Sequence, residues 1–283
     1  MKYLSDDAVA RLRQIVDAPD TSGTRYRIVE KIGRGGMGAV YKAEDSVLGR
    51  MIALKVLDDE NDEARVMAAL EHPSIVPVHD AGRLPDGRMF YAMKLVDGVP
   101  LHDFHAPLPD RLRVFQKICE AVAFAHSRGV VHGDLKPENI MIGEFGEALV
   151  LDWGVAALAG RGSIAGTRGF VAPEQASGAA MDARSDIFSL GAMLREISTG
   201  EQTRPALVSI RKKAMADDPR DRYGSALELS ADIARYLDGE PVSAHRETPW
   251  ERVARIFARH YMWILLIAAY LVMRLLLLLI LHR

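Results

Sequence analysis

The spacing of apolar residues divides the chain into an early region of strands and a later region of helices. From Tyr26, apolar and polar residues alternate as they do in strands that cover a core, and turn-forming residues separate the runs. We predict strands over 26–32, 39–43, 51–57, 75–78 and 89–95, a turn at 85–87, and helices over 63–70, 111–126, 185–199 and 207–216. Strands followed by helices predict an α+β fold with a β-rich lobe and an α-helical lobe.

The C-terminal stretch 261–281 is apolar apart from Arg274 and is long enough for a transmembrane helix. Its leucine run is apolar on every face, which argues against a buried helix of a globular domain. Arg252, Arg255, Arg259 and His260 precede it, so the positive-inside rule predicts a single pass with the bulk of the chain in the cytoplasm. A mid-span arginine costs about 2.5–3.5 kcal/mol, so shallow insertion in the lipid bilayer stays open as an alternative.

Composition excludes several classes of protein. The net charge of −2 provides no basic field for binding nucleic acid, and we expect no nucleic-acid partner. Cys119 is the only cysteine, which excludes an internal disulfide, suits a reducing cytosol and favours a small core residue. Residues 1–24 form a leader without a secretory signal, because their first twenty residues carry many charges and lack an apolar centre.

The run 131–139, Val-His-Gly-Asp-Leu-Lys-Pro-Glu-Asn, carries the strongest chemical signal. It places a carboxylate (Asp134), an ammonium group (Lys136) and an amide (Asn139) close together after two apolar residues. Phosphoryl transfer needs such a set to orient a hydroxyl, meet phosphate charge and hold a metal ion.

Two other segments fit a site for a nucleoside triphosphate. The Gly-rich run 33–40 lies between two predicted strands, where backbone N–H groups can approach phosphate oxygens. A dinucleotide-binding reading needs a helix directly after the glycines, whereas 39–43 reads as a strand. Lys55 lies on the next strand, within reach of phosphates, and Asp152 follows the apolar run 148–151 at a strand end.

These motifs, in this order, resemble the eukaryotic-like serine/threonine protein kinases, particularly the bacterial membrane-bound ones, over about 26–239. Asp152-Trp153-Gly154 resembles their Asp-Phe-Gly, 172–174 their Ala-Pro-Glu, and 217–222 the late motif whose Arg222 we expect to pair with Glu174. The resemblance implies ATP and Mg²⁺ (or Mn²⁺) as cofactors and a protein acceptor with Ser or Thr, the kinase itself included. It implies catalytic roles for Asp134, Lys136, Lys55 and Glu63, metal binding by Asn139 and Asp152, and nucleotide contacts from Gly33, Arg34, Gly35, Gly36, Met37, Gly38, Val40, Ala53, Lys55, Met93 and Leu95.

The chain also departs from the family. Gly133 stands where the catalytic loop usually has an arginine that binds a phosphorylated activation loop, and Ser163 and Thr167 are the only hydroxyls between Asp152 and Glu174. We therefore hypothesise that activity does not depend on activation-loop phosphorylation. Glu63 begins a predicted helix that resembles the family's αC, so the resemblance makes it the expected partner of Lys55, although the link between the two is short. The helix known in the family as αG, which commonly helps to dock protein substrates, is missing.

The resulting domain prediction is a leader (1–24), a kinase N-lobe (25–96), a kinase C-lobe (97–240), a basic juxtamembrane segment (241–260) and a transmembrane helix (261–281). Two functions other than an active protein kinase remain open. A small-molecule phosphotransferase of related fold can carry His-Gly-Asp in its catalytic loop, and a membrane scaffold without activity would explain the shortened regions.

Overall fold

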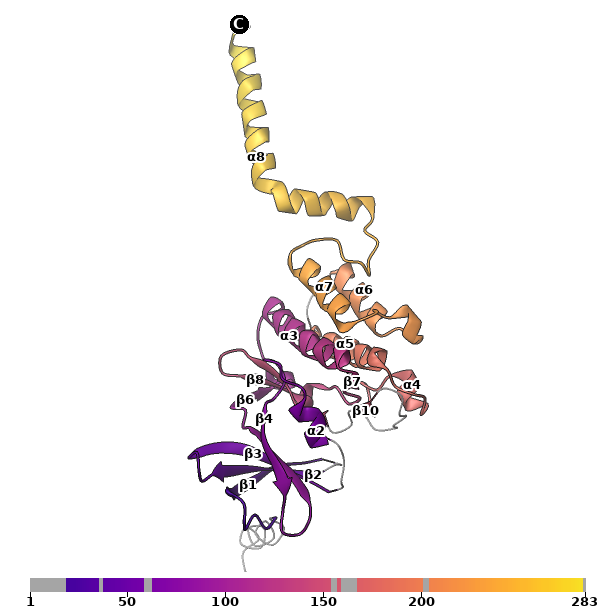
Figure 1. Ribbon diagram of the computed structural model, residues 1–283. Helices are drawn as coiled ribbons and strands as arrows, with labels where there is room; N and C mark the ends of the chain where they lie inside the picture. Colours follow the sequence, from indigo (N-terminus) through magenta and orange to yellow (C-terminus); the bar gives the residue numbers. More distant parts are fainter. Residues whose placement is uncertain are drawn as a thin grey trace, which may run out of the picture.

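The computed structural model describes residues 19–35, 38–58, 63–153, 157–158, 167–200 and 204–281. Its first lobe is an antiparallel sheet in the order β1-β2-β3-β5-β4, with helix α2 (Glu63–Ala68) beside it (Figure 1). The strands are β1 (Tyr26–Gly35), β2 (Gly38–Asp45), β3 (Arg50–Leu57), β4 (Val78–Arg83) and β5 (Met89–Lys94). The predicted strand over 75–78 is wrong, because only an isolated bridge from Ile75 to Val150 forms there and the strand begins at Val78.

Helices dominate the second lobe, as predicted, with slightly different ends. They are α3 (Leu108–Ser127), α4 (Pro173–Ala176), α5 (Ala183–Ile197), α6 (Pro205–Ala214) and α7 (Ala226–Leu237), joined by the single turns η1 (Leu101–Asp103), η2 (Pro137–Asn139) and η4 (Pro219–Asp221). Short strands β6 (Gly98–Pro100), β8 (Ile140–Gly143) and β9 (Ala148–Val150) form one sheet, and β7 (Val130–Val131) pairs with β10 (Ala157–Leu158). In the described chain no helix lies between α5 and α6.

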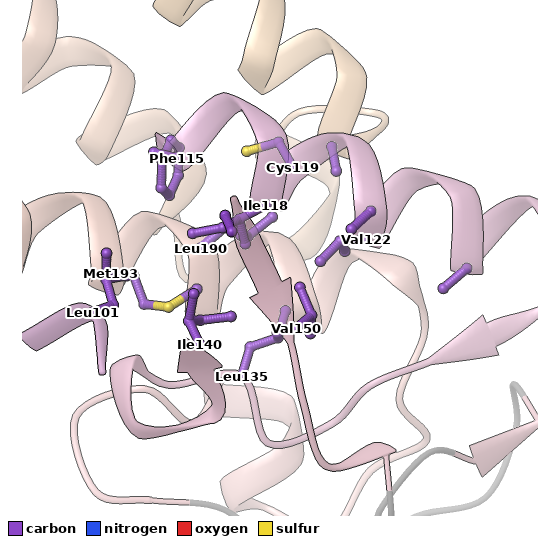
Figure 2. Packing of buried hydrophobic residues seen from close by; sticks show 14 of the residues in the cluster. Leu101, Phe115, Ile118, Cys119, Val122, Leu135, Ile140, Val150, Leu190 and Met193 are labelled. Carbon is purple, nitrogen blue, oxygen red and sulfur yellow. The ribbon is translucent and has the colours of Figure 1, made fainter. Parts of the chain in front are cut away.

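The main core lies between α3, α5 and the short strands. Figure 2 shows Ile118 and Val122 of α3 facing Leu135, Ile140 and Val150. Leu135 and Ile140 are fully buried on either side of the polar run 136–139, so the core holds both ends of that loop. Cys119 is also fully buried in this cluster, and burial raises the pKa of its thiol well above the ordinary value, as suits a small core residue.

Helix α8 (Pro249–Leu281) follows the second lobe and reaches away from it (Figure 1). No helix among the described residues is both long enough and apolar enough to cross a membrane, so the predicted transmembrane helix over 261–281 is not supported. The predicted leader lies mostly outside the described residues. The boundaries proposed for the leader, lobes and juxtamembrane segment stay predictions.

Candidate active site

The Gly-rich run forms the hairpin between β1 and β2, with Gly33 opposite Val40, Arg34 opposite Ala39 and Gly35 opposite Gly38. Gly36 and Met37, at its tip, lie outside the described residues. Gly38 has φ +148°, and a Cβ at this position would meet the carbonyl oxygen of Val56 on β3. Only glycine therefore fits there without a shift of β2 against β3. A Cβ on Gly35 would meet open space, so this strand can be approached closely by a ligand.

Beyond the hairpin, an apolar wall lines the junction between the lobes. Ala53 of β3 pairs with Met93 of β5, and both are buried. Val40 and Leu95 are partly buried against the same core cluster. An apolar wall with partly exposed members suits the flat face of an adenine ring.

Lys55 continues β3 into the site. Lys55 is buried, with 4% of its surface exposed. Its ammonium group pairs with the carboxylate of Asp152, and its Nζ lies 5.9 Å from the centre of the Tyr91 ring. A buried ammonium group needs such an anionic partner, because desolvation of an unpaired charge is costly. The predicted partner Glu63 begins α2, but its side chain lies outside the described part of the chain. That pairing stays a prediction.

Asp134 and Lys136 meet at the junction of the catalytic loop with the segment at Thr167. Lys136 Nζ donates to Asp134 Oδ2 at 2.7 Å and to Thr167 Oγ1 at 2.8 Å. Asp134 Oδ1 accepts from the Thr167 N–H at 3.1 Å and lies 3.3 Å from Thr167 Oγ1. Both carboxylate oxygens are thus held by donors, which fixes the direction of the group.

Asn139 and Asp152 are connected through the backbone, because the Leu151 N–H donates to Asn139 O at 2.8 Å. Asn139 Nδ2 donates to Asp134 O at 2.8 Å, which leaves its Oδ1 as a possible metal ligand. Asp152 has φ +57°, an unusual conformation for a residue other than glycine, and its side chain is 47% exposed. An amide oxygen and a carboxylate are the donors that Mg²⁺ prefers, and Mg²⁺ commonly takes only one or two protein ligands. Among the described residues, no group of three or more His, Cys, Asp or Glu is gathered for a metal.

The backbone of the catalytic loop rests on Asp186, which was not among the predicted site residues. Asp186 is fully buried in α5, and its carboxylate accepts from the N–H groups of His132 (2.8 Å) and Gly133 (2.9 Å) and from His126 Nε2 (2.8 Å). Burial alone would raise the pKa of Asp186, but the His126 bond and the backbone donors outweigh it and lower the pKa. A carboxylate at an apolar helix position beside Ile187 is the signal that could have identified it.

His132 and Trp153 pack together beneath the loop, with ring centres 4.7 Å apart. His132 Nδ1 accepts from the Asp134 N–H at 3.3 Å and Nε2 donates to Leu151 O at 3.0 Å, so the ring carries its hydrogen on Nε2. Trp153 is fully buried, and its Nε1 has no hydrogen-bond partner among the described residues. Within that part of the chain, the larger ring fills the position of the usual phenylalanine with its N–H group unpaired.

The predicted ion pair between Glu174 and Arg222 is confirmed. The guanidinium group binds both carboxylate oxygens at 2.7 Å, and the Arg222 side chain is fully buried. Burial by itself raises the pKa of Glu174. The bonds from Arg222 and Ser185 lower it by more, so the pKa lies below the ordinary value. This pair fixes α4 to the C-terminal end of η4.

A separate cavity of about 540 Å³ lies between α6, α7 and the beginning of α8, lined by residues such as Tyr236, His245 and Arg255. None of the predicted site residues lines it. We place the candidate site at the junction of the lobes instead, because the charged groups suited to phosphate and metal gather there.

Comparisons with known proteins give the family of the chain. The protein kinase domain family matches residues 26–226. The serine/threonine-protein kinase PknB of Mycolicibacterium smegmatis is 35% identical over 296 residues, which cover 85% of this chain and 47% of the relative. PknB of Mycobacterium tuberculosis is 37% identical, with 80% of this chain and 45% of the relative covered. The chain therefore spans about half the length of these curated relatives.

Among solved structures, the crystal structure of the Mycobacterium tuberculosis PknI kinase domain is similar, with a TM-score of 0.61 and 26% sequence identity. The match covers 77% of this chain and 99% of that domain.

Proposed function

The chain belongs to the protein kinase domain family, and from that premise we propose that it transfers the γ-phosphoryl group of ATP to a Ser or Thr hydroxyl of a protein. The comparisons confirm that the chain belongs to the bacterial eukaryotic-like serine/threonine protein kinases, as the motifs predicted. The observation that carries the proposed activity is the cluster of Asp134, Lys136 and Thr167 beside Asn139.

Asp134 is the proposed residue that orients the attacking hydroxyl. Its carboxylate is held by Lys136 and by the Thr167 N–H, so it can accept a proton from a hydroxyl in one defined direction. Phosphoryl transfer has a loose transition state, and most of the catalysis comes from positioning and from neutralised phosphate charge. Lys136 supplies a positive charge next to Asp134, and its contact with Thr167 supports a Ser/Thr rather than a Tyr acceptor.

The proposed nucleotide lies between the hairpin and the apolar wall. Lys55 is the residue proposed to bind its phosphates, with Glu63 as its proposed second partner. Asn139 and Asp152 would hold a divalent cation, which when bound neutralises phosphate charge. Asn139 Oδ1 suits that role, because the amide nitrogen is already used on the Asp134 carbonyl oxygen.

The test is a transfer assay with the full chain in detergent, γ-labelled ATP, Mg²⁺ and a generic protein acceptor. We expect label on protein, and Asp134→Asn should lower kcat by about 10²–10⁴-fold while nucleotide binding is kept. Asp110→Asn, a half-exposed carboxylate at the start of α3, is the matched control and should keep full activity. Label on a small molecule only would favour the phosphotransferase, and binding without transfer would favour the scaffold.

We also propose that activity does not need a phosphorylated activation loop. Gly133 offers no side chain to bind a phosphate, and Thr167 already contacts Asp134 and Lys136 in the unphosphorylated protein. Ser163 lies outside the described residues. Ser163→Ala should therefore retain the activity of the wild type after phosphatase treatment of both proteins, and loss of activity in a folded variant would refute the proposal.

Finally, we propose that α8 attaches the protein to a lipid membrane. One side of its first turns is charged: Arg255 binds Glu247 of the segment before α8 at 2.7 and 2.9 Å, and Glu251 lies 3.3 Å from His245. Glu251 and Arg255 line the cavity beside α6 and α7. Trp250 (82% exposed), Val253 and Phe257 lie on the opposite side at helical spacing. Further along α8, the exposed apolar residues are Tyr261, Met262, Leu265, Leu266, Ile267, Tyr270, Leu271, Val272, Met273, Leu277 and Leu278.

Aromatic residues next to an apolar run favour lipid as the partner, since Trp and Tyr prefer the membrane interface. Flotation of the full chain with vesicles of phosphatidylcholine and phosphatidylserine tests this. We expect the protein to float with the vesicles, and the variant with Trp250→Ser and Phe257→Ser to float less. Protein that stays at the bottom of the gradient, as a dimer by sedimentation, would show instead that a second copy covers α8.

A further inference from the structure

Two side chains from different helices hold Gly133 of the catalytic loop. Its carbonyl oxygen accepts from Gln175 Nε2 of α4 at 2.6 Å, and its N–H donates to Asp186 Oδ1 of α5 at 2.9 Å. Gln175 is 1% exposed, so water does not compete for this bond. The residue that stands in place of the usual arginine is thus fixed through its backbone.

Gly133 needs this support because of its conformation. Its φ is +79°, in the left-handed region, and glycine has more backbone freedom than any other residue. The peptide unit between Gly133 and Asp134 carries the Gly133 carbonyl at one end and the Asp134 N–H at the other. The N–H end makes the longer bond, 3.3 Å to His132 Nδ1. Rotation of this peptide unit would turn the Asp134 side chain away from Lys136 and Thr167.

We propose that Gln175 is a positioning residue of the transfer site. It fixes the peptide unit between Gly133 and Asp134, and through it the direction of the Asp134 carboxylate. This inference rests on the proposed function for its catalytic readout. It also assigns to α4 a role that needs no phosphate group, namely to hold the catalytic loop directly.

The position of α4 is itself fixed. Glu174, the neighbour of Gln175, binds Arg222 through both carboxylate oxygens at 2.7 Å and accepts from Ser185 Oγ at 2.8 Å. The contacts therefore run without a break from Arg222 through α4 to Gly133. The contact of Thr167, which precedes α4 in the chain, with Asp134 is a second link to the catalytic loop.

Two variants of Gln175 separate its N–H donor from its volume. Gln175→Met keeps the length of the side chain but cannot donate, and Gln175→Glu keeps the shape but places an acceptor against the carbonyl oxygen. Both should lower kcat by about 10- to 100-fold, because a buried carbonyl is left unpaired and Asp134 is no longer aligned. The KM for ATP should stay within about twofold, since none of the residues proposed to contact the nucleotide lies on α4. Ser177→Ala, an exposed hydroxyl at the end of α4, is the control and should keep the wild-type kcat.

Amide hydrogen exchange gives a readout that does not depend on activity. In the full chain, both Gln175 variants should speed exchange of the 131–136 segment, while the 112–125 segment of α3 stays protected. If the wild-type protein transfers no phosphoryl group, the proposed function fails, yet the exchange data still test Gln175. If Gln175→Met kept both the kcat of the wild type and its rate of amide exchange in the 131–136 segment, the inference would be overturned. Faster exchange in α3 as well would also overturn it, because the effect would then be global.

Discussion

Removal of the Glu174 carboxylate should strongly destabilise the helical lobe. Arg222 is fully buried and each of its five N–H groups has an acceptor: two carboxylate oxygens of Glu174 and the backbone oxygens of Arg184, Ala216 and Asp217. Glu174→Ala leaves this charge without its anion. Breaking one partner of a buried pair costs about 3–5 kcal/mol.

Thermal and urea unfolding of the full chain in detergent measure this effect. For a domain of roughly 200 residues, about 3–5 kcal/mol corresponds to a fall in the unfolding temperature of roughly 6–20 °C. Arg220→Ala is the matched control, because Arg220 pairs with Asp218 on the surface, where its side chain is 82% exposed. An exposed pair of this kind contributes about 0–1 kcal/mol.

The dependence on pH gives a second check. The pKa of Glu174 lies below its ordinary value of 4.5 in the folded protein. The stabilisation is therefore fully present above about pH 4.5 and is lost as the pH falls through the lower folded pKa. The difference in stability between wild type and Glu174→Ala should shrink over that acidic range. Equal losses for Glu174→Ala and Arg220→Ala at pH 7 would refute the reasoning.

Three further changes have defined outcomes. Gly38→Ala should lower stability by about 1–3 kcal/mol in urea unfolding, because its Cβ meets Val56 O, whereas Gly35→Ala should stay within about 0.5–1 kcal/mol of wild type. Asp186→Asn removes the charged carboxylate that accepts three N–H bonds, so kcat should fall about 10- to 100-fold in the transfer assay. An unchanged kcat would show that the support of the catalytic loop by α5 does not matter for catalysis. The Cys119 thiol, buried and with a raised pKa, should react with iodoacetamide at pH 8 only after denaturation, as a mass shift would record.

Local patterns were enough to find the chemistry of the catalytic loop. Asp134, Lys136 and Asn139 lie within six positions of one another, so any fold that places the loop at the surface brings them together. Alternation and helical spacing likewise placed most strands and helices, since each depends on neighbouring residues. The predicted strand over 75–78 was wrong, because a run of four apolar residues does not show whether it pairs along a sheet or contacts another strand at a single bridge.

Contacts between distant segments were mostly beyond the reach of these patterns. Lys55 pairs with Asp152, 97 positions away, in a contact that motif roles did not predict, since Glu63 was the expected partner. Gln175 carried no signal in the sequence, because a glutamine in a short helix is usually exposed. The ion pair of Glu174 with Arg222 could be predicted only through the family resemblance.

The order of residues along this chain thus specified which side chains carry charge and which can bind phosphate or metal, because those properties belong to each residue and its near neighbours. The folded arrangement decided which groups became buried together. Packing of α5 against α3 and the short strands places Asp186 under the loop. The bonds of Glu174 with Arg222 and Ser185 hold α4 so that Gln175 reaches Gly133. Burial removes competing water, and that is why these two hydrogen bonds can fix a flexible glycine where the family uses an arginine.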